Sequence, residues 1–261
     1  MKNAIYVYGK YVSMHVKSAM EHKVSFFLNC LGQFLTSFNV FLGVYFMLQR
    51  FHSVEGFTFE EVLLCYGVVL MSFSLSEAFA RGFDSFAGLI RKGEFDRIMV
   101  RPRNEIFQVL GSRIEFSRIG RILQAAVMLG YGMVKSPVSW NIYKMIVVFL
   151  MILGGVCVFF GIYLIYAAIC FFSTEGLEVM NIFTDGVREY GKYPLSIYGK
   201  RVLTIVTFVI PYGLAWYYPM LYLFGRGSFL YGLFPVPASL FIIPCLGAWK
   251  FGLKRYRSTG S

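Results

Sequence analysis

Residues 145–172 read MIVVFLMILGGVCVFFGIYLIYAAICFF and contain no charged side chain. A helix needs roughly 20 apolar residues to cross the hydrocarbon core of a bilayer, so this stretch predicts a membrane-spanning helix. The rest of the chain has the same character, because 57% of its 261 residues are hydrophobic and only 15% are charged. Soluble domains carry about 25% charged residues. The composition therefore excludes a soluble enzyme, a disordered chain and a secreted disulfide scaffold, and it indicates an integral membrane protein.

Five further stretches bring the prediction to six membrane-spanning helices. They are residues 24–48, 62–79, 114–134, 202–224 and 233–251. The third is the shortest, because only 13 uncharged residues separate Arg121 from Lys135, about 20 Å of helix. We expect it to begin near Ile114, with Arg118 and Arg121 reaching towards the lipid headgroups. The predicted fold is all-α and polytopic, with a six-helix transmembrane domain over residues 24–261.

The distribution of lysine and arginine predicts the orientation. If the N-terminus is cytoplasmic, 21 of the 25 basic residues fall in inner segments. Segments on the cytoplasmic side of a membrane carry such an excess. Both termini are therefore predicted to be cytoplasmic, in the plasma or inner membrane of a bacterial cell. The same rule explains the formal charge of +11, so we expect no nucleic-acid partner.

Residues 1–23 predict an amphipathic helix at the inner membrane surface. Its lysines at positions 10 and 17 are seven residues apart, away from the apolar face. The apolar face consists of Ile5, Tyr8, Val12, Val16 and Ala19. Such a helix lies against membrane lipids with its lysines near anionic headgroups. It is either a simple tether or a connection to a cytoplasmic partner, and the sequence leaves both roles open.

Small residues and prolines within the spans are candidates for helix packing or for a pathway. Gly154, Gly161 and Ala168 recur at intervals of seven. Small residues on one face let helices approach closely, either within the chain or against a second copy. Pro211 and Pro219 interrupt the fifth span. Interrupted helices can line a pathway, although prolines are also common in ordinary transmembrane helices.

Glu77 is the only carboxylate well inside a predicted span. An ionisable residue within the membrane is a functional candidate by default. It also lies four residues before Arg81, so an ordinary ion pair within one helix is the alternative.

The residue types needed for catalysis are sparse. The stretch GVREYGKY at 186–193 approaches a phosphate-binding loop, but Tyr193 stands where that motif requires Ser or Thr. The five cysteines are dispersed in apolar runs, without a histidine at ligand spacing. We therefore expect no catalytic, cofactor-binding or metal-binding residue. Energy for uphill transport has to come from another polypeptide.

The largest polar segment between two spans covers residues 80–105. Phe83, Phe86 and Ile90 form the apolar face of a short helix, which ends at Arg91. The next ten residues, 93–102, read GEFDRIMVRP. This arrangement resembles the ABC-2-type exporter permeases, in particular their small six-helix branch. There a short helix and a G-x-(L/F)-D-x-x-(L/M)-x-R-P-like segment join the second and third spans. The residues that carry the match are Gly93, Phe95, Asp96, Arg101 and Pro102.

The resemblance implies that this segment couples the chain to a separate ATP-binding cassette subunit, which holds ATP and magnesium. Phe83, Phe86 and Ile90 would then fill a groove on that subunit, with Arg91, Arg97 and Arg101 at its polar rim. The alternative is a solvated basic loop. We expect Phe86→Asp or Ile90→Asp to uncouple transport without unfolding the spans.

The resemblance also implies a second permease chain, identical or related. This chain then forms half of an export pathway for a hydrophobic, amphipathic or cationic substrate. Two alternatives belong to other classes: a membrane-embedded lipid-modifying enzyme, and a passive channel. The enzyme requires clustered polar residues near an interface, and the channel requires a polar repeat along a span. The sequence contains neither pattern.

Overall fold

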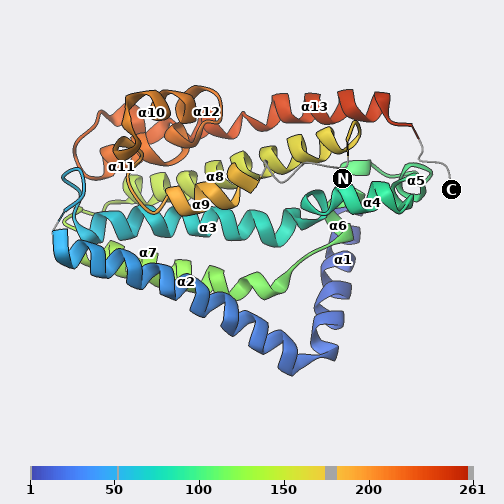
Figure 1. Ribbon diagram of the computed structural model, residues 1–261, viewed down its shortest axis with the longest axis horizontal. Coiled ribbons are helices and arrows are strands. Elements are labelled where there is room, and N and C mark those ends of the chain that lie inside the picture. Colours follow the sequence, from blue (N-terminus) through green and yellow to red (C-terminus); the bar gives the residue numbers. More distant parts are fainter. Residues whose placement is uncertain (1, 52, 174–180, 258–261) are drawn as a thin grey trace.

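The computed structural model describes residues 2–51, 53–173 and 181–257, and every regular element in these ranges is helical. The chain begins with α1 (Lys2–Glu21) and α2 (Lys23–Phe51), which meet at a sharp elbow. Figure 1 shows α1 lying across the long axis of the molecule, while α2 runs back along it. A position of α1 along a membrane surface stays a prediction.

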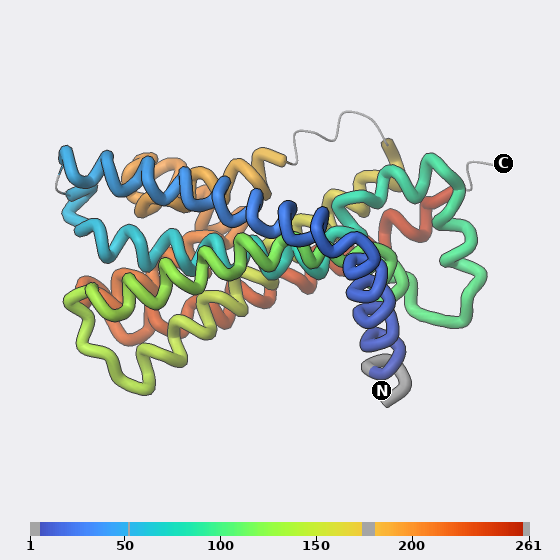
Figure 2. Tube along the Cα trace, turned by 90° about the horizontal axis from the view of Figure 1, so that it is seen from below, coloured from blue at the N-terminus to red at the C-terminus, as the bar shows by residue number. Residues whose placement is uncertain are grey.

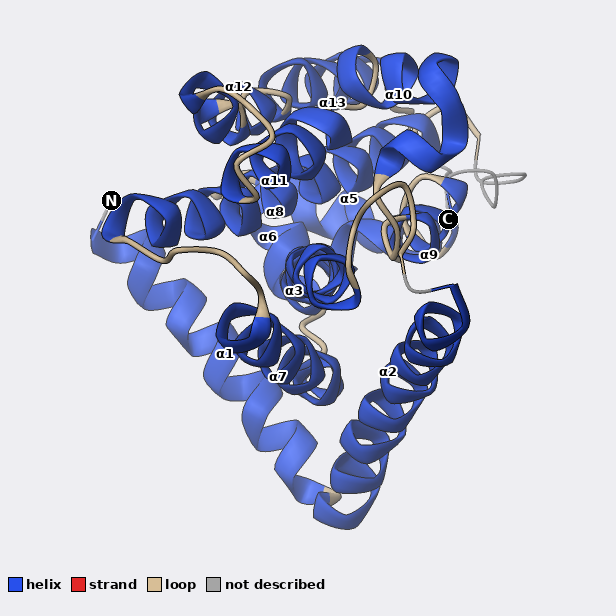
Figure 3. Ribbon diagram, turned by 90° about the vertical axis from the view of Figure 1, so that its left-hand side faces the viewer, coloured by secondary structure: helices blue, strands red, loops and turns tan. Residues whose placement is uncertain are grey.

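The centre of the bundle is α3 (Phe59–Asp84), with α7 (Ile119–Lys135) and α8 (Ile142–Cys170) packed along it. Seen end-on in Figure 3, α3 lies inside the bundle and α2 at its margin. A capping box starts α3: the Thr58 hydroxyl accepts from the amide of Glu61, and the Glu61 carboxylate accepts from the amide of Thr58. These two bonds satisfy donors that a helix start leaves open.

Close contact between α2 and α7 depends on Gly120. A Cβ atom added there would lie 1.8 Å from the carbonyl oxygen of Cys30. No other residue type fits without moving one helix away from the other. The two helices therefore touch backbone to backbone near the elbow.

Short helices connect α3 to α7 beyond one end of the bundle, on the right in Figure 1. They are α4 (Phe86–Arg91), α5 (Glu94–Met99), α6 (Glu105–Ser112) and η1 (Phe116–Arg118). Gly93 links α4 to α5 with a φ of +65°, a left-handed conformation that glycine adopts without strain. The N-terminal α1 packs on this end, where Tyr8 and Tyr11 contact the ring of Phe107.

The second half of the chain folds over the outside of α8. Its elements are α9 (Asp185–Tyr190), η3 (Leu195–Tyr198), α10 (Gly199–Phe208), the π-helical η4 (Gly213–Tyr217), α11 (Tyr218–Leu223), η5 (Phe229–Leu233), α12 (Pro235–Ser239) and α13 (Ile242–Arg255). Both α12 and α13 lie along α8. In Figure 2, α1 (dark blue) and the C-terminal end of α13 (red) both lie towards the right of the view.

The small residues of α8 face this last segment. A Cβ on Gly154 would meet the backbone of Pro235, and one on Gly161 would meet Cys245 and Phe241. Further along, a Cβ on Gly252 would lie 2.9 Å from the carbonyl oxygen of Ala168. The small-residue stripe thus packs within the chain, which decides between the two interpretations that the sequence left open.

Four helical stretches are long and apolar enough to cross a membrane: Lys23–Phe51, Phe59–Arg91, Ile142–Cys170 and Phe229–Arg255. Leu195–Phe208 and Gly213–Leu223 together form a fifth candidate, bent by 98°. With 17 residues, α7 is shorter than a full crossing. The described residues therefore support four or five of the six predicted spans, and the number six stays a prediction.

The fifth segment differs from the straight span predicted at 202–224. Pro211 lies in the break between its two arms, whereas Pro219 occupies the first turn of α11, where proline is tolerated. The preceding α9 packs against α3 rather than beyond the inner end of the bundle. Arg188 of α9 lies beside the Phe73 ring of α3, and the side of the membrane on which α9 lies stays a prediction.

Candidate functional site

Aromatic rings hold together the end of the bundle that carries α4 and α5. The rings of Phe86 and Phe95 are 4.9 Å apart, and Trp249 of α13 lies 5.1 Å from Phe86. Aromatic pairs at such distances stabilise a fold by about 0.5–1.5 kcal/mol each beyond their burial. We call this group the inner aromatic cluster; its members are Phe83, Phe86, Phe95, Phe171, Trp249 and Tyr256.

The burial of this cluster corrects the predicted docking surface. Phe83 and Phe86 are 0% exposed and Ile90 is 3% exposed. These side chains pack inside the chain and are not available to fill a groove on another protein. The expected result of Phe86→Asp is therefore also revised, because a carboxylate at this buried position disrupts folding.

Asp96 of the predicted motif closes the cluster. Its carboxylate accepts a hydrogen bond of 2.9 Å from the hydroxyl of Tyr256, just beyond α13. Burial and this hydrogen bond raise the pKa of Tyr256 to about 12, so the hydroxyl stays a donor at neutral pH. The bond joins the last helix of the chain to the segment between α3 and α7.

The exposed part of this segment lies one turn further along. Val100 is 83% exposed, and Met99 beside it is also exposed. Arginines and a lysine surround them. We call this surface the basic tip; it consists of Arg91, Lys92, Arg97, Met99, Val100, Arg101, Pro102 and Arg103. Arg91, Arg97 and Arg101 were predicted from the sequence, whereas Met99 and Val100 were missed. The signal that could have found them is an apolar pair outside the helical period of its neighbours.

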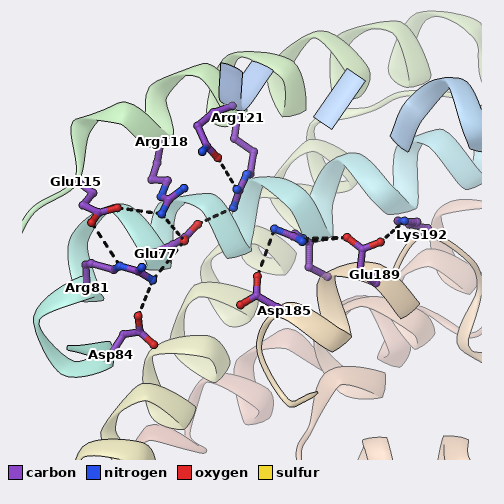
Figure 4. Close-up of polar contacts among 11 residues, drawn as sticks. Glu77, Arg81, Asp84, Glu115, Arg118, Arg121, Asp185, Glu189 and Lys192 are labelled. Carbon is purple, nitrogen blue, oxygen red and sulfur yellow. Dashed lines mark hydrogen bonds and ion pairs between the residues drawn. The ribbon is translucent and has the colours of Figure 1, made fainter. Parts of the chain in front are cut away.

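Behind the tip, Glu77 lies in a network of ion pairs (Figure 4). Its carboxylate is 2.6 Å from Arg121, 3.0 Å from Arg118 and 3.5 Å from Arg81. The predicted pair with Arg81 is thus present, and the two partners on η1 and α7 were missed. Arg121 also donates to Gln33 of α2 at 2.5 Å. The structure corrects the expectation that Arg118 and Arg121 extend to the headgroups, since both turn inwards.

A second carboxylate extends this network towards the tip. Glu115 is 2.8 Å from Arg113, 2.9 Å from Arg118 and 3.4 Å from Arg81. Arg81 in turn pairs with Asp84 at the end of α3. We call the whole group the inner charge network: Gln33, Glu77, Arg81, Asp84, Arg113, Glu115, Arg118 and Arg121. It ties α2, α3, η1 and α7 together.

Four more charges lie beside the middle of α3. The guanidinium of Arg188 is 5.3 Å from the centre of the Phe73 ring, and a Cβ on Gly191 would meet Val69. Arg188 lies 3.3 Å from Asp185 and 3.0 Å from Glu189, and Lys192 pairs with Glu189 (Figure 4). These four, the α9 charge cluster, comprise two acids and two bases.

Among the described residues, no group of three or more His, Cys, Asp and Glu side chains is arranged to hold a metal ion. The polar groups form ion-pair networks and an exposed basic surface. Such an arrangement fits helix coupling and partner contact.

In a comparison with protein families, residues 34–260 match the model of the ABC-2 family transporter protein. Searches against curated proteins and against solved structures gave no match. The matched range contains all but the first elements, including the inner aromatic cluster, the basic tip and the α9 charge cluster. With its long apolar helices, this chain belongs to the ABC-2 transporter family and is a multi-pass membrane permease of an ABC transporter.

Proposed function

We propose that the chain is the membrane-spanning subunit of an ATP-driven exporter, coupled at the basic tip to a separate ATP-binding subunit. The observation that carries this proposal is the contrast within residues 80–105. The inner aromatic cluster is fully packed, while the adjacent tip exposes Val100 among arginines. An apolar centre with a charged rim is typical of protein interfaces.

The packed cluster gives the tip a rigid base. Trp249 and Tyr256 hold α4 and α5 against α13, so a displacement of the tip moves α3 and α13 together. Binding and hydrolysis of ATP on the partner would in this way tilt the spans. The chain itself contributes the moving pathway, and ATP and magnesium belong to the partner.

A second permease chain completes the pathway in this proposal. The α9 charge cluster lies beside the centre of α3 with the Asp185 side chain 55% exposed. A charge in contact with lipid at the bilayer centre costs about 2.5–3.5 kcal/mol or more, so this face has to meet protein or water. A related or identical chain facing α9 encloses a water-accessible route for a hydrophobic or amphipathic substrate.

The test compares two equally exposed valines at opposite ends of the molecule. Val100→Asp is expected to abolish co-purification of the ATP-binding subunit from mild detergent, because it places a carboxylate in the apolar centre of the tip. Val134→Asp makes the same change at the end of α7, where the side chain is 80% exposed. It is expected to leave the association unchanged.

Monodispersity on a sizing column shows whether each variant is folded. If Val100→Asp is monodisperse and still carries a stoichiometric ATPase, the tip is not the coupling surface. If the unaltered chain purifies as a stable monomer without any ATPase, the exporter proposal itself fails.

A further inference from the structure

An apolar cavity of about 290 Å³, open on one side where Tyr190 and Val202 are exposed, lies between α9, η3 and α10. Its wall residues come from all three elements: Val187, Tyr190, Leu195, Tyr198, Val202 and Val206. Tyr212, in the break between the two arms of the segment, completes the lining. The cavity exists because the chain turns at Pro211 instead of crossing straight.

Two of the three tyrosine hydroxyls at this cavity are bound to backbone carbonyls. Tyr198 donates to the carbonyl of Tyr190 at 3.0 Å, and Tyr212 donates to the carbonyl of Phe183. Aliphatic groups and ring surfaces therefore make up most of the wall. A buried water needs two to four polar partners, so this cavity favours an apolar occupant over water.

The volume limits what the cavity can hold. An engineered cavity of about 150 Å³ with a similar apolar wall stays dry and binds benzene. At 290 Å³ the present cavity holds roughly two aromatic rings, or a branched aliphatic group of that size. It is too small for a whole lipid.

Charged groups flank the cavity on the same short helix. Val187 and Tyr190 of α9 line it, whereas Arg188 and Glu189, adjacent in sequence, belong to the α9 charge cluster. The six-residue α9 therefore carries lining residues of the cavity on one face and the charges of the α9 charge cluster at its other positions. One element thus presents both halves of a site for an amphipathic molecule.

We propose that this cavity binds the two-ring-sized apolar part of an amphipathic substrate, whose polar part lies beside the α9 charge cluster. This inference rests on the proposed function, because it names the class of molecule that the permease carries. Phospholipid acyl chains are the competing occupant, and the experiment below separates the two.

The probe is dansylamide, which has two fused aromatic rings and a small polar head. Trp216 reports on it, because its ring stacks on Tyr212 at 5.1 Å. Energy transfer from tryptophan to bound dansylamide is measured on the permease, with its ATP-binding subunit, in phospholipid nanodiscs. Transfer is expected in the unaltered chain and is expected to decrease in Trp216→Phe, in which Trp140 and Trp249 remain as donors.

Val206→Phe fills the cavity, and the dissociation constant of dansylamide is expected to rise at least about tenfold, or 1.4 kcal/mol. The matched control is Ile205→Phe, on the neighbouring α10 residue, which is 57% exposed and does not line the cavity. This control is expected to bind dansylamide as the unaltered chain does.

Equal binding by Val206→Phe and Ile205→Phe would overturn the inference. If energy transfer to dansylamide occurs in detergent but not in phospholipid nanodiscs, lipid acyl chains occupy the cavity. That result would also overturn the inference. Association with the ATP-binding subunit is recorded on the same samples. If the two variants bind dansylamide equally while the ATP-binding subunit stays associated, only this inference is refuted. If the ATP-binding subunit does not associate with the chain, the proposed function is refuted.

Discussion

The inner charge network and the α9 charge cluster both place acids and bases beside α3, yet they differ in enclosure. Glu77 and Arg121 each have side chains only 7% exposed, and three helices surround them. In the α9 charge cluster, Asp185 and Glu189 remain open on one side. The enclosed network holds helices together, while the open cluster needs a further surface to cover it. Enclosure, more than residue type, separates these two groups of ion pairs.

Removing Glu77 is the most severe test of this distinction. Glu77→Ala leaves Arg121 buried without its carboxylate partner, while Arg118 keeps Glu115, so we expect a loss of about 3–5 kcal/mol in unfolding free energy. Denaturant unfolding of the purified permease in detergent measures this change. Glu77→Gln keeps hydrogen-bonding atoms in place and should lose less. A Glu77→Ala protein as stable as the unaltered chain would show that the network contributes no stability.

The contact between α2 and α7 is the next test, because it brings Gln33 to Arg121. Gly120→Ala puts a methyl group against the Cys30 carbonyl. Overpacking of this kind costs about 1–3 kcal/mol. Gly130→Ala is the matched control on the same helix, since a Cβ there meets nothing within 4 Å. Thermal melting is expected to shift for Gly120→Ala alone; equal shifts would refute the close approach.

Tyr256→Phe removes the hydrogen bond to Asp96, and we expect a loss of about 1 kcal/mol. The raised pKa adds a pH dependence with a definite sign. Because the folded state favours the protonated hydroxyl, its contribution is complete below the ordinary value of 10.0 and disappears as the pH rises towards about 12. The melting temperatures of Tyr256→Phe and the unaltered chain should therefore differ at pH 9 and converge at pH 11.5. A constant difference across that range would contradict the assignment.

The smallest effect on stability is expected at the open cluster. Asp185→Asn removes a charge from a half-exposed pair, and such pairs contribute about 0–1 kcal/mol. The same substitution is expected to change transport or substrate-stimulated ATP hydrolysis by the complex. Denaturant unfolding and ATPase assays on one preparation compare the two effects. A large loss of stability with normal ATPase stimulation would reverse the roles given to the two clusters.

The sequence predicts well what depends on neighbouring residues. The uncharged run at 145–172 becomes α8, and the pair between Glu77 and Arg81 needs only helical spacing. Arg118 and Arg121 join Glu77 from another helix, across more than 40 positions. Their inward direction depends on how α7 packs on α3, which no local pattern contains.

The inner aromatic cluster shows a different limit. Phe83, Phe86 and Ile90 have the apolar spacing of a surface that another molecule covers. The same apolar spacing also occurs in a helix that another part of the same chain covers. Here Trp249, more than 150 residues away in the sequence, packs on Phe83 and Phe86. The position of α9 beside the middle of α3 is likewise set by packing on α3, because its charged sequence alone favours contact with water.

The inner aromatic cluster has a mechanical consequence. A force on α5 reaches α3 through the peptide backbone and α13 through stacked rings, and these two helices lie against different sides of α8. We therefore expect α3 and α13 to move together around α8. α7 packs along α3, where a Cβ on Gly67 would meet Leu129 and one on Gly132 would meet Leu64, and α2 packs on α7. A displacement of the basic tip would therefore carry α2, α3, α7 and α13 along as one connected group of helices.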